Sequence, residues 1–247
     1  MKTFFVLFKT EVKLMMRNAD TLFFGIVIPV GLAILLGFIY GDKPAEEGAS
    51  YTALAQSFGA IASVGICATS LMTLPLTVAG ERDKKVLKHY KVTPVHPGML
   101  LTVHIIIDFI VSVISSLCVF VAMALFFGYR MSGAFLPFAG SYILVAAAMF
   151  GIGALIASLC KTIRQSNTVT SLVYFPMFFL SGATVPYEIM PKPLQTAMNI
   201  LPLTQGIKLL KATSLGLDNV NCLAPIIILV SIAVISIVIS IRVFKWE

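Results

Sequence analysis

The chain has 247 residues, of which 58% are hydrophobic and only 12% are charged, and its formal net charge is +7. Soluble globular domains are about 45–50% apolar, so this composition excludes an ordinary soluble domain and indicates an integral membrane protein. Membrane topology and attraction to anionic lipid explain the excess of basic residues better than nucleic-acid binding does.

Six stretches between successive charged residues are long enough to cross a bilayer, which takes about 20 apolar residues. Their bounding residues are Asp20 and Asp42, Glu47 and Glu81, Asp108 and Arg130, Arg130 and Lys161, Arg164 and Glu188, and Asp218 and Arg242. Because lipid offers backbone groups no hydrogen-bond partner, all six are expected to be helices. The predicted fold is an all-α integral membrane protein, a single domain over residues 1–247 with six transmembrane helices.

Basic residues fall mainly on one predicted side of the membrane. Thirteen of the 18 lie in the N-terminal segment, after the second and fourth spans, or at the C-terminus. The other side has the remaining five, which are Lys43, Arg130, Lys192, Lys208 and Lys211. By the positive-inside rule, both termini are expected to be cytoplasmic in a multi-pass protein of the cell membrane, and a bacterial plasma membrane is the expected setting.

Residues 1–19 are predicted to form an amphipathic helix in the inner membrane interface. One helical face would carry the apolar residues Phe4, Phe8, Val12 and Met15. Basic residues, among them Lys9 and Lys13, would line the opposite face, and these charges argue against a cleavable signal peptide. The alternative is a plain basic segment that fixes topology.

Several kinds of site are not predicted. The four cysteines (Cys67, Cys118, Cys160 and Cys222) show neither a pairing framework nor metal-ligand spacing, and the three histidines (His89, His96 and His104) form no HExxH pattern. No GxxxxGK(S/T) loop is present, so the chain is not expected to bind ATP phosphates by itself. Gly151 and Gly153 are expected to serve close helix packing within a span. We therefore predict no catalytic residue and no metal ligand.

A short basic segment, residues 81–92, lies between the second and third spans. On a helix, Val86, Leu87 and Tyr90 would share one arc while the lysines fill another, and Thr93-Pro94 would end the helix. An ordered apolar face exposed to the cytoplasm implies a docking partner. The alternative is a loop whose charge merely fixes topology.

Two blocks resemble the ABC-2 type permeases, the membrane subunits of ATP-binding-cassette exporters of the type V kind. The first is GERDKKVLKHYKVTPVHPGMLL, residues 80–101, and the second is FPMFFLSGATVPYEIMPKPLQTAMNILPLTQGIKLLKATSLG, residues 175–216. With the N-terminal helix and six spans, the resemblance covers nearly the whole chain. One departure is the pair Lys84 and Lys85, where the family often has a small residue.

The resemblance implies that residues 81–92 are a coupling helix that inserts into a separate P-loop ATP-binding-cassette subunit. The residues expected at that contact are Glu81, Arg82, Val86, Leu87 and Tyr90. ATP and Mg²⁺ would bind to the partner, and this chain would bind no cofactor. Two permease copies, or one copy and a sister chain, would export an amphipathic molecule such as a drug, an antimicrobial peptide or a lipid-like compound.

The segment after the fifth span, residues 186–216, is predicted to contain two short helices, 193–201 and 204–215, that are too short to cross the membrane. We expect them to be re-entrant and broken at Pro202 and Gly206. The resemblance places this region over the extracellular mouth, where it would form a lid that bends at Gly182, Pro186 and Pro202. A surface loop held in the interface is the alternative.

Polar residues also recur along the third span. They are His104, Asp108, Ser112 and Ser115. A charge at the membrane centre costs at least about 2.5–3.5 kcal/mol, so Asp108 is expected to be neutral, paired with His104, or in contact with a wet cavity. The stripe would contact substrate, carry protons, or only join helices by hydrogen bonds. Two alternatives to ATP-driven export follow: a proton-coupled secondary transporter that uses Asp108 and His104, and a membrane sensor or scaffold without transport.

Overall fold

A computed structural model describes residues 2–41, 43–45, 51–85, 97–184, 187, 190–217 and 222–243. Within these residues all regular elements are helical, and no sheet forms beyond an isolated bridge between Pro44 and Thr52. In chain order the elements are α1 (Lys2–Met15), α2 (Ala19–Leu22), the π-helical segment η1 (Phe23–Val27), α3 (Ile28–Tyr40), α4 (Ala53–Cys67), the π-helical segment η2 (Ala68–Thr73), α5 (Leu74–Asp83), α7 (Pro97–Phe127), α8 (Phe135–Leu159), α9 (Ile163–Leu180), α10 (Lys192–Met198), α11 (Pro202–Leu215) and α12 (Leu223–Val243).

Five continuous helical stretches in the described part of the chain are long and apolar enough to cross a membrane. They are Phe23–Tyr40, Ala53–Asp83, Gly98–Phe127, Phe135–Leu159 and Leu223–Val243. These confirm the all-helical membrane fold and match five of the six expected spans. The helix α9 occupies the place of the remaining one, but it has 18 residues, begins with the polar sequence IRQSNT and contains Pro176.

The second span, which runs through α4, η2 and α5, is the centre of the bundle. In its most apolar window 83% of the residues are buried, against 28% for the first span and for α12. Glycines let neighbouring helices approach this span closely: a Cβ on Gly153 of α8 would lie 1.9 Å from the carbonyl oxygen of Ser70. Gly151, in the same helix, serves close packing against α12 instead, where a Cβ would lie 3.2 Å from Ser236 Cβ. The predicted packing role of both glycines is confirmed.

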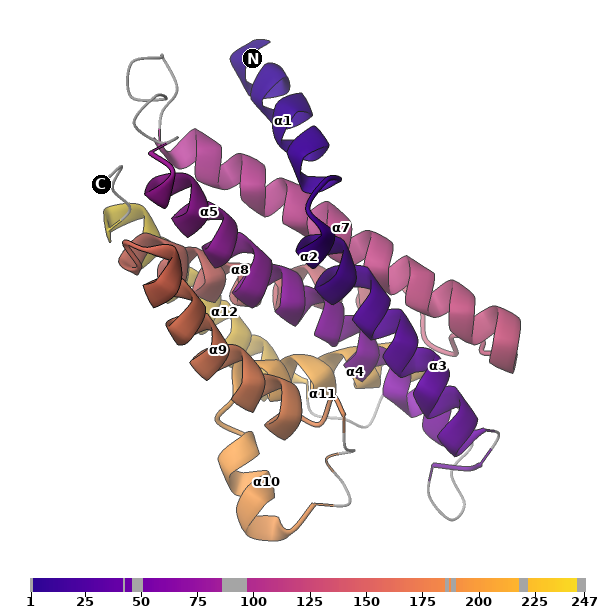
Figure 1. The fold of residues 1–247 in the computed structure, drawn as a ribbon. Helices are drawn as coiled ribbons and strands as arrows, with labels where there is room; N and C mark the ends of the chain where they lie inside the picture. Colours follow the sequence, from indigo (N-terminus) through magenta and orange to yellow (C-terminus); the bar gives the residue numbers. More distant parts are fainter. Residues whose placement is uncertain are drawn as a thin grey trace.

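The apolar face of α1 packs against α7, whereas the sequence suggested a helix that buries this face in lipid. Leu7 forms a small cluster with Leu100, Val103 and Ile107 of α7. The four residues predicted for the apolar face of the helix lie partly buried against the same cluster: Phe4, Phe8, Val12 and Met15. Figure 1 shows α1 reaching past the end of the bundle, with α7 running alongside its lower half.

The two short helices predicted after α9 are present, but their boundaries differ from the predicted ones. The first, α10, has 7 residues, and the 14 residues of α11 span about 21 Å, which is too short to cross a bilayer. The expected break at Gly206 is wrong, because Gly206 lies inside α11, where a Cβ would come within 2.9 Å of Val145. Pro202 starts α11 rather than bending it, and Gly182 turns the chain after α9 with φ = +91°. Pro186 lies outside the described residues.

The two ends of the bundle carry different elements. Figure 1 shows α1, the last turn of α5 and the C-terminal end of α12 at one end. The short helix α10 and the end of α3 lie at the opposite end. We call the first of these the α1 end and the second the α10 end.

Candidate functional site

Glu81 and Arg82 lie in the last turn of α5, so they continue the second span and do not begin a separate helix. The chain then turns at Lys84 and at Lys85, which has a φ of +58°. The predicted docking residues Val86, Leu87 and Tyr90 lie outside the described residues. Of the predicted docking segment, the structure therefore describes only residues 81–85.

Arg82 ties the end of α5 to the end of α8. Its Nη1 donates hydrogen bonds to the carbonyl oxygens of Cys160 and, at 3.3 Å, of Ala157. The last carbonyls of a helix have no partner within the helix and carry the negative end of its dipole. A guanidinium placed there satisfies these carbonyls and complements their charge.

Asp83 makes the corresponding contact with the start of α9. Its Oδ2 accepts a hydrogen bond of 2.7 Å from the backbone N–H of Ile163, the first residue of that helix. A carboxylate suits this position because the first N–H groups of a helix are unpaired and carry partial positive charge. The chain between α8 and α9 is thus held from both sides by adjacent residues of α5.

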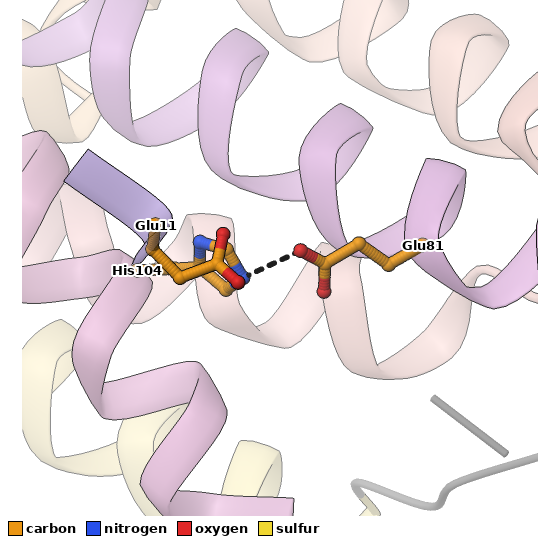
Figure 2. A group of neighbouring side chains, drawn as sticks. All are labelled: Glu11, Glu81 and His104. Atoms are coloured by element: carbon orange, nitrogen blue, oxygen red, sulfur yellow. Dashed lines mark ion pairs between the residues drawn. The ribbon is translucent and has the colours of Figure 1, made fainter. Parts of the chain in front are cut away.

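Glu81 faces a third direction, toward α7. Its Oε1 lies 3.0 Å from Nε2 of His104, and Figure 2 shows Glu11 of α1 turned toward the same imidazole. One potential ligand atom from each of Glu11, Glu81 and His104 lies within 4.8 Å of the others. Glu11 and His104 are each only 5% exposed. Since the sequence spacing of the histidines predicted no metal ligand, it is the fold that brings these three groups together.

A small cavity of about 100 Å³ adjoins these groups. Its lining includes Asp108, which is 4% exposed, and the hydroxyl-bearing residues Thr73 and Thr77. The rest of the predicted stripe on α7 is not part of this lining: Ser112 Oγ donates to the carbonyl oxygen of Phe109 at 2.8 Å, and Ser115 is fully buried. The stripe therefore divides into two titratable residues, His104 and Asp108, beside a cavity and two serines inside the helix packing.

Ser115 lies where α7 packs closely against Gly65 of α4. A Cβ on Gly65 of α4 would come within 2.8 Å of Ser115 Oγ. Ser115 Oγ is buried without a hydrogen-bond partner among the described residues, so at this serine the helices pack closely without the interhelical hydrogen bond that the sequence left open.

A larger cavity of about 560 Å³ opens at the α10 end. Apolar side chains from several helices line it, among them Leu36, Ile207 and Pro225, and Gly182 borders it. Within the described part of the chain, three hydroxyls in its wall are buried without a hydrogen-bond partner: those of Ser181, Thr184 and Thr204. An apolar cavity with a few unpaired polar groups is the usual form of a site for an amphipathic small molecule.

A lysine also borders this larger cavity. The Nζ of Lys208 donates to Asn199 Oδ1 at 2.5 Å and lies 4.2 Å from the ring centroid of Tyr187. These contacts join α11 to the chain before and after α10. Since all three residues belong to the predicted lid region, 186–216, these contacts hold that region together internally.

Sequence reasoning missed Glu11 and the hydroxyls of the larger cavity. Glu11 had a detectable signal, since it follows Leu7 by four residues and Phe4 by seven and so shares the apolar face of α1. An acidic residue on such a face points to a buried partner. Ser181 and Thr184, in the turn after α9, and Thr204, in α11, carry no comparable pattern.

The profile of the ABC-2 type transporter family matches residues 2–215, which is most of the chain. The chain belongs to the ABC-2 type transporter family. It is thus the membrane permease component of a transporter, and permeases of this family work with ATP-binding-cassette subunits that bind the ATP. Membrane subunits of this kind carry no ATPase domain and bind no cofactor.

Individual relatives agree with this assignment. Over 133 residues the permease is 26% identical to the "Inner membrane transport permease YhhJ" of Escherichia coli (strain K12), a match that covers 53% of this chain and 36% of the relative. It is 21% identical over 193 residues to the "Putative transport permease YvfS" of Bacillus subtilis (strain 168), covering 78% and 77% of the two chains. The permease thus spans about a third of the first relative, and its helices and that relative's name indicate a multi-pass protein of the cell membrane.

Proposed function

We propose that the chain is the permease half of an ATP-driven exporter and that the force from a separate ATP-binding-cassette subunit enters it through residues 81–92. The observation that carries this proposal is the attachment of the last turn of α5. Glu81, Arg82 and Asp83 contact α7, the end of α8 and the start of α9 respectively. A displacement of the chain at Lys84 would therefore move α7, α8 and α9 together. Coupling between distant sites depends on such contacts between packed helices.

The proposed topology has six spans, with α9 as the fifth, and both termini in the cytoplasm. The positive-inside rule supports this orientation. The position of α1 and the end of α12 at the same end of the bundle supports an even number of crossings. In this arrangement α1 lies at the cytoplasmic interface, and α10 and α11 form a re-entrant lid over the extracellular mouth.

The proposed cargo is an amphipathic molecule such as a drug, an antimicrobial peptide or a lipid-like compound, which moves outward between two permease copies or between this chain and a sister chain. The larger cavity at the α10 end supports an amphipathic cargo, because its wall combines apolar side chains with the unpaired hydroxyls of Ser181 and Thr204. Gly182 at its border and Pro202 at the start of α11 are the proposed flexible points of the lid.

The test is transport by the permease reconstituted with the ATP-binding-cassette subunit that co-purifies with it. Changing Leu87 or Tyr90 to Asp puts a charge on the proposed docking arc and is expected to abolish ATP-driven export while the protein still inserts. Lys88→Asp is the matched control, since it adds the same group on the polar arc of the predicted helix, and we expect it to retain export. Full export by Leu87→Asp and Tyr90→Asp would contradict coupling through this segment.

A proton-coupled carrier is the second candidate, because Asp108 and His104 are both buried beside the small cavity. The same vesicles distinguish it. With a pH gradient but no nucleotide and no partner subunit, the exporter is expected to move nothing. Flux under those conditions that Asp108→Asn abolishes would favour the carrier instead.

A further inference from the structure

We infer that Glu11, Glu81 and His104 form a binding site for a divalent transition-metal ion of the Zn²⁺ class, which would join α1 to α5 and α7. Three separate elements contribute one ligand each, and the ligand atoms lie within 4.8 Å of one another. The inference does not depend on the proposed function of residues 81–92.

The distances suit metal ligands. Two ligands that each lie about 2.0–2.1 Å from a tetrahedral Zn²⁺ are about 3.3 Å apart. Glu81 Oε1 and His104 Nε2 are separated by 3.0 Å, and a carboxylate oxygen of Glu11 lies within 4.8 Å of the ligand atoms of both residues. A small movement of these side chains would make room for an ion between them.

The hydrogen bonding at the cluster is incomplete. Glu81 Oε1 pairs with His104 Nε2 at 3.0 Å, but the second oxygen of Glu81, Oε2, is buried without a hydrogen-bond partner among the described residues. Buried polar atoms normally have a partner, and leaving one unpaired costs about 1–3 kcal/mol. A metal ion bound by Glu81 would satisfy this oxygen.

The composition of the cavity wall also suits a cation. Glu11, Glu81, Asp108 and His104 all line the small cavity. Carboxylate oxygens and an imidazole nitrogen are among the groups that bind divalent metal ions in proteins.

The ligand chemistry indicates the kind of ion. Zn²⁺ accepts imidazole nitrogens and carboxylate oxygens as ligands, and Mn²⁺ or Co²⁺ would also bind them, whereas Ca²⁺ and Mg²⁺ prefer oxygen ligands alone. The cavity of about 100 Å³ has room for a water as a further ligand, near the hydroxyls of Thr73 and Thr77. Bound there, the ion would hold α1 against the spans directly before the chain leaves α5.

The test is Zn²⁺ titration of the full-length permease in detergent micelles after removal of bound metal with a chelator, followed by calorimetry. We expect one ion per chain, and at least about tenfold weaker binding in each of Glu11→Gln, Glu81→Gln and His104→Gln. Asp83→Asn is the matched control, because it removes a carboxylate two residues from Glu81 that faces α9, and its affinity should be unchanged.

Thermal unfolding gives a second measurement that reports whether each variant is folded. Zn²⁺ should raise the midpoint of the unaltered protein, because a ligand that binds the folded state stabilises it, and it should not raise that of His104→Gln. Less than one ion per chain in the unaltered protein, equal affinity in Glu81→Gln and His104→Gln, or an equal loss in Asp83→Asn would overturn the inference.

Discussion

At the scale of single residues, the sequence GERD at 80–83 has an unusually dense set of contacts. Each of its three charged side chains reaches a different helix: α7 through His104, α8 through its terminal carbonyls, and α9 through its first N–H group. The partners of Arg82 lie at the end of α8, and the partner of Asp83 lies at the start of α9. These two contacts therefore fix where α8 ends and where α9 begins. The Glu-Arg pair therefore has a structural role in addition to any contact with a partner subunit.

Arg82→Ala is expected to destabilise the permease by about 1.5–3 kcal/mol, because it leaves the carbonyls of Ala157 and Cys160 without their charged donor. Arg82→Lys should restore part of the loss, since an ammonium lacks the fork geometry of a guanidinium. Equilibrium unfolding in mixed detergent micelles measures the difference. Lys84→Ala, an exposed change in the next turn, is the control, and equal stability of both alanine variants would refute this role.

At the scale of elements, the close packing of α8 against η2 decides how the second span is held. The π-helical segment η2 precedes Pro75, which lacks the N–H that a regular helix would use. Thr69 Oγ1 donates to the carbonyl oxygen of Gly65 at 2.9 Å, so this hydroxyl is used within its own helix. The irregular stretch η2 brings the carbonyl oxygen of Ser70 so close to Gly153 that residue 153 has no room for a side chain.

Gly153→Ala should therefore force α8 away from η2 and destabilise the bundle by about 1–3 kcal/mol. Gly140→Ala is a matched control in the same helix, because a Cβ there meets nothing within 4 Å. That change is expected to be neutral or to stabilise by up to about 1 kcal/mol, since alanine favours helix. Thermal unfolding of both variants checks the difference, and a Gly153→Ala protein as stable as Gly140→Ala would disprove the close contact.

At the scale of the whole molecule, the α1 end and the α10 end are predicted to face opposite sides of the membrane. The exposed residues Lys84 and Lys192 mark these two ends. In a background without the four native cysteines, Lys192→Cys is expected to react with a membrane-impermeant maleimide on intact cells, and Lys84→Cys is expected to react after permeabilisation only. Labelling of Lys84→Cys in intact cells would invert the proposed orientation.

Hydropathy and charge spacing were enough to predict the membrane class, five of the spans and the short helices α10 and α11, because each depends on the length and polarity of one continuous segment. The family also followed from residues 80–101 and 175–216, whose motifs are local. The boundaries were less accurate. Gly206 was predicted to break a helix, but its neighbour Val145 belongs to α8, and no local pattern reveals that contact.

The candidate sites depend on contacts that link distant parts of the chain. Glu11, Glu81 and His104 come from three helices, and Arg82 meets carbonyl groups 75 and 78 residues away. The sequence by itself determined which segments lie in the membrane, since transfer into lipid is a property of each segment. Tertiary packing alone decided which buried polar groups meet, because a buried carboxylate needs a partner and only the arrangement of the helices supplies one.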